Sequence, residues 1–481
     1  MVRNYQLIAF ALAVLATGDA AAQQPSSRGA LTQGSFAITN VNVIPMTRDT
    51  LLRDQTVLVR DGRIVRVGAA RSVSVPAGVE RIDGRGKYLM PGLADMHAHL
   101  YADGVVPDSA APAELGVFIA HGITMVRLMI GTPQHLELRR QVERGELIGP
   151  QLWIASPHFN TRDPENARVV KTPEEVRTAV REVKAAGYDF VKITFGIVGP
   201  LYEALIDEAA KASIKVVGHV EPEVGVRRAI AAGQQIEHLD AYFEGALRDD
   251  APMKSSVTQY GVYQPQNWQS LQYIDEARLD SLAVLTARSG TWSVPTLEIF
   301  NRAFSIPLTD EELKALPDWQ LIPNAIRGPY VRSRDRYWAQ PVARETRARF
   351  AELRYRITKR IADAGGKLMV GSDSPDLLMA YGYAMHRELE AMVKAGLTPY
   401  QVLRAATVNA AAFLGATREW GTIEAGKRAD FMLLNANPLE NISNTQKIEL
   451  VSMGGQRFDQ AARDAMIVRA RKAIDGAAPA N

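Results

Sequence analysis

Four of the eight histidines in this chain stand at the ends of short apolar runs, where they could bind a metal ion together. His97 and His99 belong to the run 92–99 (GLADMHAH), and His219 and His238 belong to two later runs. Residues i and i+2 of a strand point to the same face, so the first two imidazoles can bind a single metal ion. The chain contains no cysteine, so a metal must be held by histidine, carboxylate or another hard ligand.

Two further polar residues occupy comparable positions. Lys192 lies between Val191 and Ile193 in an apolar run, where burying an ammonium group is costly unless it is paired or modified. Asp373 ends the last run. Each residue alone has an ordinary explanation, such as a core histidine or, for the aspartate, a helix N-cap. Together they predict a ring of metal ligands, namely His97, His99, Lys192, His219, His238 and Asp373.

The elements that must position these residues can be read from the apolar runs. Eight runs alternate with helical stretches over residues 91–415: GLADMHAH, GITMVRLM, PQLWIAS, YDFVKITF, IKVVGHV, QQIEHLD, TWSVPTL and GKLMVGSD. Strands joined by helices indicate a parallel sheet, and eight such units favour an α/β fold, a (β/α)₈ TIM barrel with insertions. A doubly wound open sheet is the alternative, but it would normally carry a glycine-rich nucleotide turn after its first strand, and this sequence has none.

The two segments that flank the barrel region have a different residue pattern. Both contain short runs rich in valine, isoleucine and leucine, and Asp61-Gly62 and Asp83-Gly84 are typical hairpin turns. We therefore expect one small β-sandwich built from residues 36–90 and 416–460. A C-terminal helix or tail follows at 461–481.

The first 22 residues have the pattern of a cleavable secretory signal peptide. Arg3 precedes the apolar run 7–16, and three alanines at 20–22 offer a cleavage site. The run is too short to span a bilayer, and no cysteine follows it to carry a lipid anchor. Residues 23–35 are predicted to be a flexible lead-in. We expect a periplasmic or secreted protein.

The motif PGLADMHAHL at 91–100, combined with the ligand residues that follow it, resembles the amidohydrolase superfamily. Within that superfamily it is most similar to the imidazolonepropionase-like and prolidase-like metal-dependent members. The segments 386–415 and 421–442 are typical of the same proteins, and the likeness extends from about residue 36 to 459. The resemblance implies a hydrolytic TIM barrel and indicates little about the substrate.

The resemblance also implies a place for each ligand. His97 and His99 match the pair that holds the more buried metal, and His219 and His238 match the ligands of a second metal. Lys192 matches the lysine that two-metal members carry as an N-carboxylated bridge. We therefore expect two divalent metal ions, and Zn²⁺ suits these ligands best.

Asp373 is the predicted catalytic residue, because the aspartate at its position binds metal and handles protons in these families. It would accept the proton of a metal-bridged hydroxide and deliver it to the leaving amine. For substrate binding we expect His158, Tyr242 and Arg127.

Two long segments, 241–272 and 297–345, are rich in aromatic residues and contain several arginines. They can form the wall of a substrate pocket, or they can pack over the barrel rim or at an oligomer interface. The sequence leaves these alternatives open.

Composition narrows the class of protein further. A net charge of +3 is too balanced for a nucleic-acid-binding surface, and 47% hydrophobic residues are ordinary for a globular protein. The sequence predicts an exported metal-dependent amidohydrolase that cleaves a dipeptide, an N-acyl amino acid or a related small-molecule amide. A cyclic amide or lactone hydrolase with the same site is the alternative, and a non-catalytic ligand-binding relative is a third reading. We expect a homo-oligomer, and no nucleic-acid or membrane partner.

Overall fold

The structure is a computed structural model, and we describe residues 34–162, 167–252, 265–305, 308–376 and 379–476. The predicted signal peptide, nearly all of the predicted lead-in and the last residues of the predicted tail lie outside these ranges. Within the described residues, no helix is both long enough and apolar enough to cross a lipid bilayer.

Each of the eight predicted runs contains a parallel strand, which confirms the expected alternation. Three strands form one sheet: β6 (Leu93–Ala98), β7 (Ile123–Leu128) and β8 (Gln151–Ile154). The other five belong to a seven-stranded sheet, with two additional short strands at its edge. In spatial order these are β10 (Ala167–Val169), β9 (His158–Asn160), β11 (Phe190–Ile193), β12 (Lys215–Gly218), β13 (Gln235–Glu237), β14 (Trp292–Val294) and β15 (Lys367–Leu368).

Isolated bridges connect the two parallel sheets at both ends. Ala155 pairs with Phe190 beyond β8, and Ala98 pairs with Ser374 beyond β15. A hydrophobic cluster that includes residues from both sheets, among them Met96, lies between the strands and the segment 410–420. The carboxyl ends of β6 and β15 are therefore neighbours, although they are far apart in the sequence.

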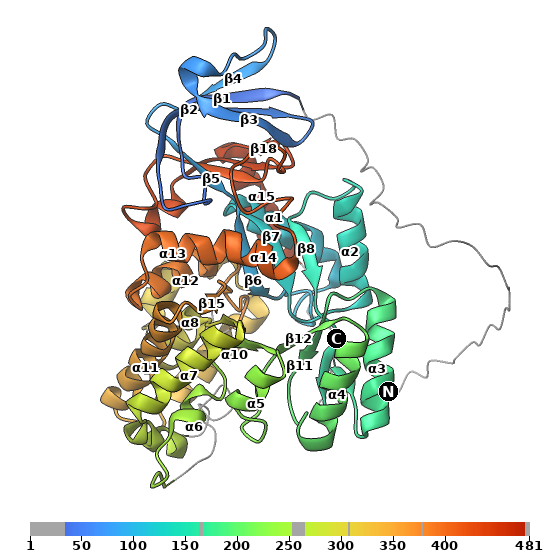
Figure 1. Cartoon of the computed structure of the whole chain (residues 1–481), viewed down its shortest axis with the longest axis vertical. Helices are drawn as coiled ribbons and strands as arrows, with labels where there is room; N and C mark the ends of the chain where they lie inside the picture. The colour runs from blue at the N-terminus through green and yellow to red at the C-terminus, as the bar shows by residue number, and fades with distance from the viewer. Residues whose placement is uncertain (1–33, 163–166, 253–264, 306–307, 377–378, 477–481) are drawn as a thin grey trace, which may run out of the picture.

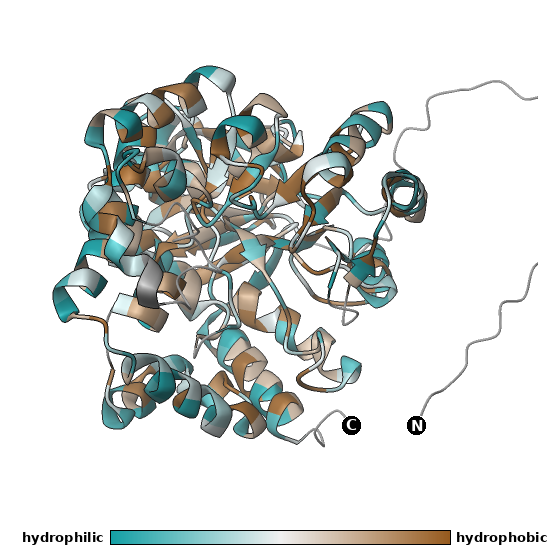
Figure 2. Ribbon diagram, turned by 90° about the horizontal axis from the view of Figure 1, so that it is seen from below, coloured by the Kyte–Doolittle hydropathy of each residue, from teal (hydrophilic) through white to brown (hydrophobic). Residues whose placement is uncertain are grey.

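Helices surround these strands (Figure 1). They are α1 (Ala111–Ala120), α2 (Pro133–Glu143), α3 (Pro173–Ala186), α4 (Gly199–Lys211), α5 (Val226–Ala231), α6 (Tyr242–Ala246), α7 (Glu276–Ser289), α11 (Arg344–Asp363) and α12 (Tyr383–Lys394). The outer helices alternate between hydrophilic and hydrophobic residues in Figure 2, as expected for helices that bury one face. In α3, Thr172 caps the first turn by accepting from the Glu175 amide, and Gly187 ends the helix at φ +92°.

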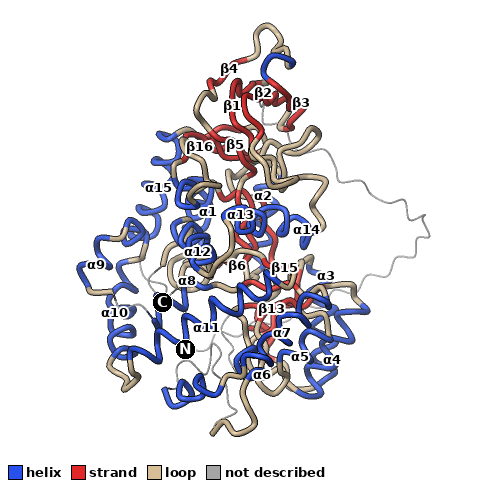
Figure 3. Tube along the Cα trace, turned by 60° about the vertical axis from the view of Figure 1, so that its left-hand side comes forward, coloured by secondary structure: helices blue, strands red, loops and turns tan. Residues whose placement is uncertain are grey.

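The two flanks join in a single eight-stranded sheet at one end of the molecule (Figures 1 and 3). Its strands are β1 (Phe36–Val43), β2 (Leu52–Arg60), β3 (Arg63–Ala69), β4 (Glu80–Asp83), β5 (Tyr88–Pro91), β16 (Phe431–Leu434), β17 (Ile448–Met453) and β18 (Gln456–Phe458). Strand β5 pairs parallel with β1 and antiparallel with β16, so it connects the strands of the N-terminal flank with those of the C-terminal flank. The expected union of the flanks is present, but a two-layer sandwich is not confirmed, because the described flank strands belong to one sheet.

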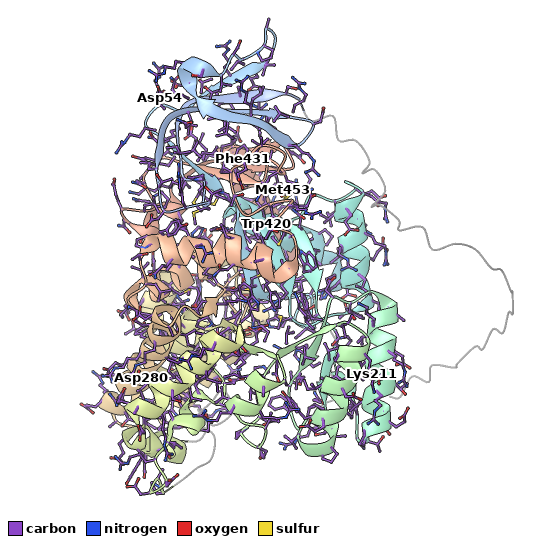
Figure 4. The ribbon with its side chains drawn as sticks, in the orientation of Figure 1. Asp54, Lys211, Asp280, Trp420, Phe431 and Met453 are labelled. Carbon is purple, nitrogen blue, oxygen red and sulfur yellow. The ribbon has the colours of Figure 1, made fainter. Side chains whose placement is uncertain are left out.

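The flank sheet contributes to two hydrophobic clusters, one within the sheet and one shared with the parallel strands. Phe431, labelled in Figure 4, packs edge-on against Phe36 with ring centroids 6.3 Å apart. Trp420 lies between this sheet and the strands below, in the same hydrophobic cluster as Met96. Helices α13 (Pro399–Arg404), α14 (Ala410–Leu414) and α15 (Gln460–Asp475) complete this end. Strand β5 ends at Pro91 and β6 begins at Leu93, so the sheet leads directly into the strand that carries the first two histidines.

Five helical segments lie between β14 and α11 and stand apart from the regular pattern. They are α8 (Leu297–Phe300), the π-helical turn η5 (Asn301–Ser305), α9 (Asp310–Ala315) and α10 (Asn324–Trp338), with the 3₁₀ turn η6 (Pro317–Leu321) between the last two. Leu313 and Ile322 form a small hydrophobic cluster of their own with neighbours from these segments. This insertion occupies much of the aromatic-rich range 297–345.

Candidate metal centre

Three predicted ligands converge at the neighbouring ends of β6 and β15. Nε2 of His97 lies 3.2 Å from Oδ1 of Asp373, and Nε2 of His99 lies 3.3 Å from the same oxygen. Ligand atoms of these three residues all lie within 4.8 Å of one another. Two imidazoles and a carboxylate at this separation can hold a divalent cation.

The other two predicted histidines adjoin this group. The rings of His219 and His238 stack with centroids 4.7 Å apart, and the ring of His238 is also 4.7 Å from that of His97. Nδ1 of His238 lies 3.6 Å from Oδ2 of Asp373. The structure thus brings four imidazoles and one carboxylate to a single edge of the strands.

A polar neighbour anchors Nδ1 of three of the four imidazoles. Glu237 accepts from His97 at 2.8 Å, and Asp240 accepts from His219 at 2.8 Å. The Thr296 hydroxyl lies 2.7 Å from the Nδ1 atom of His238. A ligating histidine usually has its other nitrogen held in this way, which fixes the ring and presents Nε2 to the metal. The donor set therefore fits a metal ion.

The charge states of the ring residues also suit metal binding. Burial lowers the pKa of His97, His219 and His238 well below the usual value, and the nearby Lys192 ammonium lowers each pKa further. Neutral imidazoles keep a lone pair for a cation, whereas protonated ones do not.

Lys192 lies on β11 and is only 1% exposed. Burial lowers its pKa to about 8, although the carboxylates of Glu237 and Asp373 oppose this shift. Gly218 on the adjacent strand makes room for the side chain: a Cβ at this position would lie 3.0 Å from Cδ of Lys192 and 2.4 Å from the Ile193 carbonyl oxygen, and its φ is +120°. The lysine is therefore held beside the histidines with no space for a bulkier neighbour.

Left-handed backbone clusters around the site. His238, Leu239 and Ala241 after β13 have φ between +57° and +62°, Thr296 after β14 has +46°, and Asp373 after β15 has +55°. Such conformations cost roughly 1–3 kcal/mol each in residues other than glycine and persist where the surroundings enforce them, often at functional sites. Two of the five strained residues are predicted metal ligands.

Arg354 on α11 helps to hold two of these left-handed turns in place. Its buried guanidinium donates to the carbonyl of His238 at 2.8 Å and to the carbonyl of Pro295 at 2.7 Å. It therefore ties the turn after β13 to the turn after β14. Arg354 also lies over the Phe300 ring, 3.9 Å from the centroid.

The three predicted substrate contacts have different placements. His158 is the first residue of β9, and its pKa is lowered well below normal by burial and by the Lys192 charge. Its Nε2 atom is buried without a hydrogen-bond partner among the described residues, so it is available to a ligand. This placement suits the predicted role.

Arg127 and Tyr242 are placed where they cannot reach a substrate, so these two assignments need correction. Arg127 is fully buried and donates to Glu237 at 2.6 Å and Gln235 at 2.8 Å, which makes it a support for the carboxylate behind His97. Tyr242 is fully buried, and its hydroxyl lies 2.6 Å from that of Thr286 on α7. The left-handed turn that precedes Tyr242 directs its side chain toward that helix.

Four residues that hold the ligands in place through hydrogen bonds were not predicted from the sequence, namely Glu237, Asp240, Thr296 and Arg354. Glu237 and Asp240 flank His238 closely, so their proximity to a predicted ligand was a usable signal. Thr296 and Arg354 carried no such signal, because each reaches the site from a distant segment.

Residues 88–457 match the model of the amidohydrolase family, and the chain belongs to that family. It is 25% identical over 409 residues to the imidazolonepropionase of Sphingopyxis alaskensis, covering 82% of this chain and 90% of that protein. Among solved structures it resembles a candidate prolidase from Bifidobacterium longum, with 26% identity, a TM-score of 0.65, and coverage of 91% and 99% of the two chains.

The bottromycin amidohydrolase has a similar fold as well, with a TM-score of 0.72 at 22% identity and coverage of 92% and 91%. These neighbours identify the arrangement of parallel strands and helices as a TIM-barrel-type α/β fold. In such folds the carboxyl ends of the strands carry the active site, which is where the histidine cluster lies. Family membership supports a hydrolytic enzyme acting on carbon–nitrogen bonds.

Proposed function

We propose that this protein is a metal-dependent hydrolase of small-molecule amides that holds two divalent metal ions, best suited to be Zn²⁺. The observation that carries the proposal is the set of four imidazoles, three of them buried and anchored through Nδ1, gathered around one carboxylate. The bridges between the two parallel sheets support a closed (β/α)₈ barrel around this set.

The ligands divide into two groups by position. His97, His99 and Asp373 would hold one ion, since their ligand atoms already lie together. His219 and His238 would hold the second, because their stacked rings adjoin the first group. Lys192 would complete both sets as a carbamate.

Carbamate formation requires a neutral amine. The free amine of Lys192 attacks carbon dioxide, a nitrogen–carbon bond forms, and one proton leaves to solvent. A pKa of about 8 leaves a useful fraction of the amine neutral near pH 7, which supports this reaction. The product is an anion, and it replaces a buried cation whose charge otherwise acts on His97, His219 and His238.

The chain's own residues account for substrate positioning and proton transfer. Divalent ions at this site would supply a Lewis acid for the substrate carbonyl and would lower the pKa of water. Asp373 accepts the proton of the attacking water as the carbon–oxygen bond forms. It then delivers that proton to the nitrogen as the carbon–nitrogen bond breaks. His158 offers its unpartnered Nε2 to a polar group of the substrate.

Dipeptides and N-acyl amino acids are the proposed substrates, in keeping with the likeness to a candidate prolidase. A cyclic amide or a lactone is the second candidate, favoured by the similarity to an imidazolonepropionase. Initial rates on matched acyclic and cyclic amides would separate the two.

The first test is elemental analysis of the purified protein, for which we expect about two divalent ions per chain. Loss of activity in Asp373→Asn with metal retained would assign the proton transfer to Asp373. Lys192→Met should retain at most one ion, whereas Lys215→Met, which alters a partly exposed lysine on β12, should retain both. A wild-type protein that binds no divalent ion would overturn the proposal.

A further inference from the structure

A cavity of about 200 Å³ lies under helix α10, between that helix and the π-helical turn η5. Its walls are mostly apolar or aromatic, formed by Phe304, Leu308, Leu313, Tyr330 and Tyr337. An apolar cavity of about 150 Å³ is large enough to hold benzene, so this one can take a benzyl-sized group. We call it the α10 cavity.

Two series of side-chain contacts connect the walls of the α10 cavity with the metal centre. The ring of Phe304 contacts that of Phe300, and the Phe300 ring contacts that of His238, with centroids 5.7 Å apart in both pairs. On the other side, the Tyr330 hydroxyl donates to Oδ1 of Asp376 at 3.4 Å, three residues after the catalytic aspartate. The Phe300 ring thus lies between the Phe304 wall and His238, and the Tyr330 wall contacts the segment that carries Asp373.

The rim of the α10 cavity is cationic. Three arginines line it, and two of them are matched by carboxylates of the protein. Arg302 is paired with Glu298 and Asp318, and Arg334 with Asp310 and Asp335. Arg336 is exposed and makes no ion pair within the described part of the chain. One guanidinium therefore remains to attract an anionic group of a ligand.

A second polar group at the cavity also points to a ligand. Oε1 of Gln340 is buried and has no hydrogen-bond partner among the described residues. A buried acceptor without a hydrogen bond costs about 1–3 kcal/mol of stability. A donor on a bound molecule would form the missing hydrogen bond and recover that free energy. An amide N–H is such a donor.

We propose that the α10 cavity is the subsite that selects the substrate: it takes an aromatic group, with an adjoining carboxylate directed to Arg336. The inference rests on the proposed amide hydrolysis and specifies its substrate class as N-acyl aromatic amino acids, in which the amide nitrogen, the aromatic side chain and the free carboxylate belong to the same amino acid. The packing of Leu313 and Ile322 maintains the outer wall before any ligand arrives. Preformed walls reduce the ordering cost of binding.

Binding can be tested without catalysis, on the full-length protein with metal removed. We expect 3-phenylpropionate to bind in calorimetric titrations more tightly than propionate. Ala303→Phe fills the cavity from η5 and should weaken 3-phenylpropionate at least tenfold, as should Ser333→Trp, which blocks the exposed rim from α10. Ala325→Phe is the matched control, because Ala325 is exposed on α10 away from the cavity. Unchanged binding in both cavity variants would overturn the assignment.

The rim charge has its own test. Arg336→Gln should weaken 3-phenylpropionate at least threefold and leave 3-phenylpropan-1-ol unaffected, since the alcohol lacks the anion. Arg332→Gln removes another exposed arginine of the same helix that does not line the cavity, and should change neither ligand. Equal losses for the acid and the alcohol would overturn the role of Arg336.

Kinetics of the metal-loaded enzyme separate this inference from the proposed function. We expect the ratio of kcat/KM for N-acetyl-L-phenylalanine to that for N-acetylglycine to fall at least tenfold in Ala303→Phe. If small amides are hydrolysed and the ratio does not change, the subsite is wrong and the proposed function stands. If 3-phenylpropionate binds but no amide is hydrolysed, the proposed function is wrong and the binding site stands.

Discussion

At the scale of single residues, the groups behind the ligands determine whether the site can work. Glu237 is fully buried between the Arg127 guanidinium and Nδ1 of His97. Burial raises its pKa, whereas the charges of Arg127 and Lys192 oppose that shift. The carboxylate therefore has two functions at once: it orients an imidazole and neutralises a buried arginine.

Glu237→Gln tests this arrangement. The amide keeps the shape but removes the negative charge that His97 and Arg127 share, so we expect metal affinity to fall about 10–100-fold. Competition with a chelator of known affinity measures the change. Glu208→Gln removes another largely buried carboxylate, which lies on α4 and is paired with Arg181 of α3, and should leave metal affinity unchanged. Equal affinities for wild type and Glu237→Gln would contradict the positioning role.

Arg354 gives a second prediction at this scale. Arg354→Met would leave the His238 and Pro295 carbonyls without their buried donor, which costs about 3 kcal/mol of stability and relaxes the turn that carries His238. We expect kcat/KM to fall at least tenfold, measured together with chemical denaturation. Arg349→Met, on the exposed side of the same helix, should affect neither quantity. A stability loss with unchanged kcat/KM would restrict Arg354 to a structural role.

At the scale of elements, sequence patterns were sufficient for the strands and insufficient for the contacts between distant elements. The strand and the two ligands in the run 92–99 could both be predicted from that run alone. An apolar run indicates a buried strand, and the i, i+2 spacing indicates two side chains on one face, so neither prediction needs a distant segment. Tyr242 illustrates the limit: its distance along the chain from His238 is short, but the left-handed residues between them redirect its side chain. Arg354 lies 116 positions after His238, and no local pattern links an arginine on an amphipathic helix to that carbonyl.

Two buried histidines, one at the C-terminal end of α1 and one on α12, make stability depend on pH. His121 at the end of α1 and His386 on α12 are buried, and burial lowers their pKa values to about 4 and about 3. Nε2 of His386 lies 3.1 Å from the carbonyl oxygen of His121. Both histidines take up protons more readily in the unfolded chain, so acidification below pH 6.5 favours unfolding.

When the pH is lowered from 7 to 5, we expect each of these two histidines to reduce the free energy of unfolding by about 2 kcal/mol. Urea denaturation at several pH values measures this loss. His386→Gln should remove part of the pH dependence, because glutamine does not titrate, whereas Gln401→Ala on exposed α13 should retain all of it. An identical slope in His386→Gln and wild type would contradict the assignment.

At the scale of the whole molecule, we expect the flank sheet and the metal-binding strands to unfold as one cooperative unit. The main hydrophobic cluster includes Met90 of β5 and Met432 of β16 together with residues of the parallel strands. Strand β5 also leads directly into β6. Loss of structure in the sheet should therefore be transmitted to the metal centre, and metal binding should stabilise the sheet.

Phe431→Ala combined with metal removal tests this coupling. Phe431 is fully buried against Phe36, so its truncation should cost about 3–5 kcal/mol, and metal at a thousandfold excess over its Kd should contribute about 4 kcal/mol. If the molecule unfolds as one unit, both perturbations shift a single calorimetric transition, and their effects add because the sites are far apart. Val468→Ala, at an exposed position on α15, should leave that transition in place. Two resolved transitions, with Phe431→Ala moving one and the chelator moving the other, would show that the sheet and the metal-binding strands unfold independently.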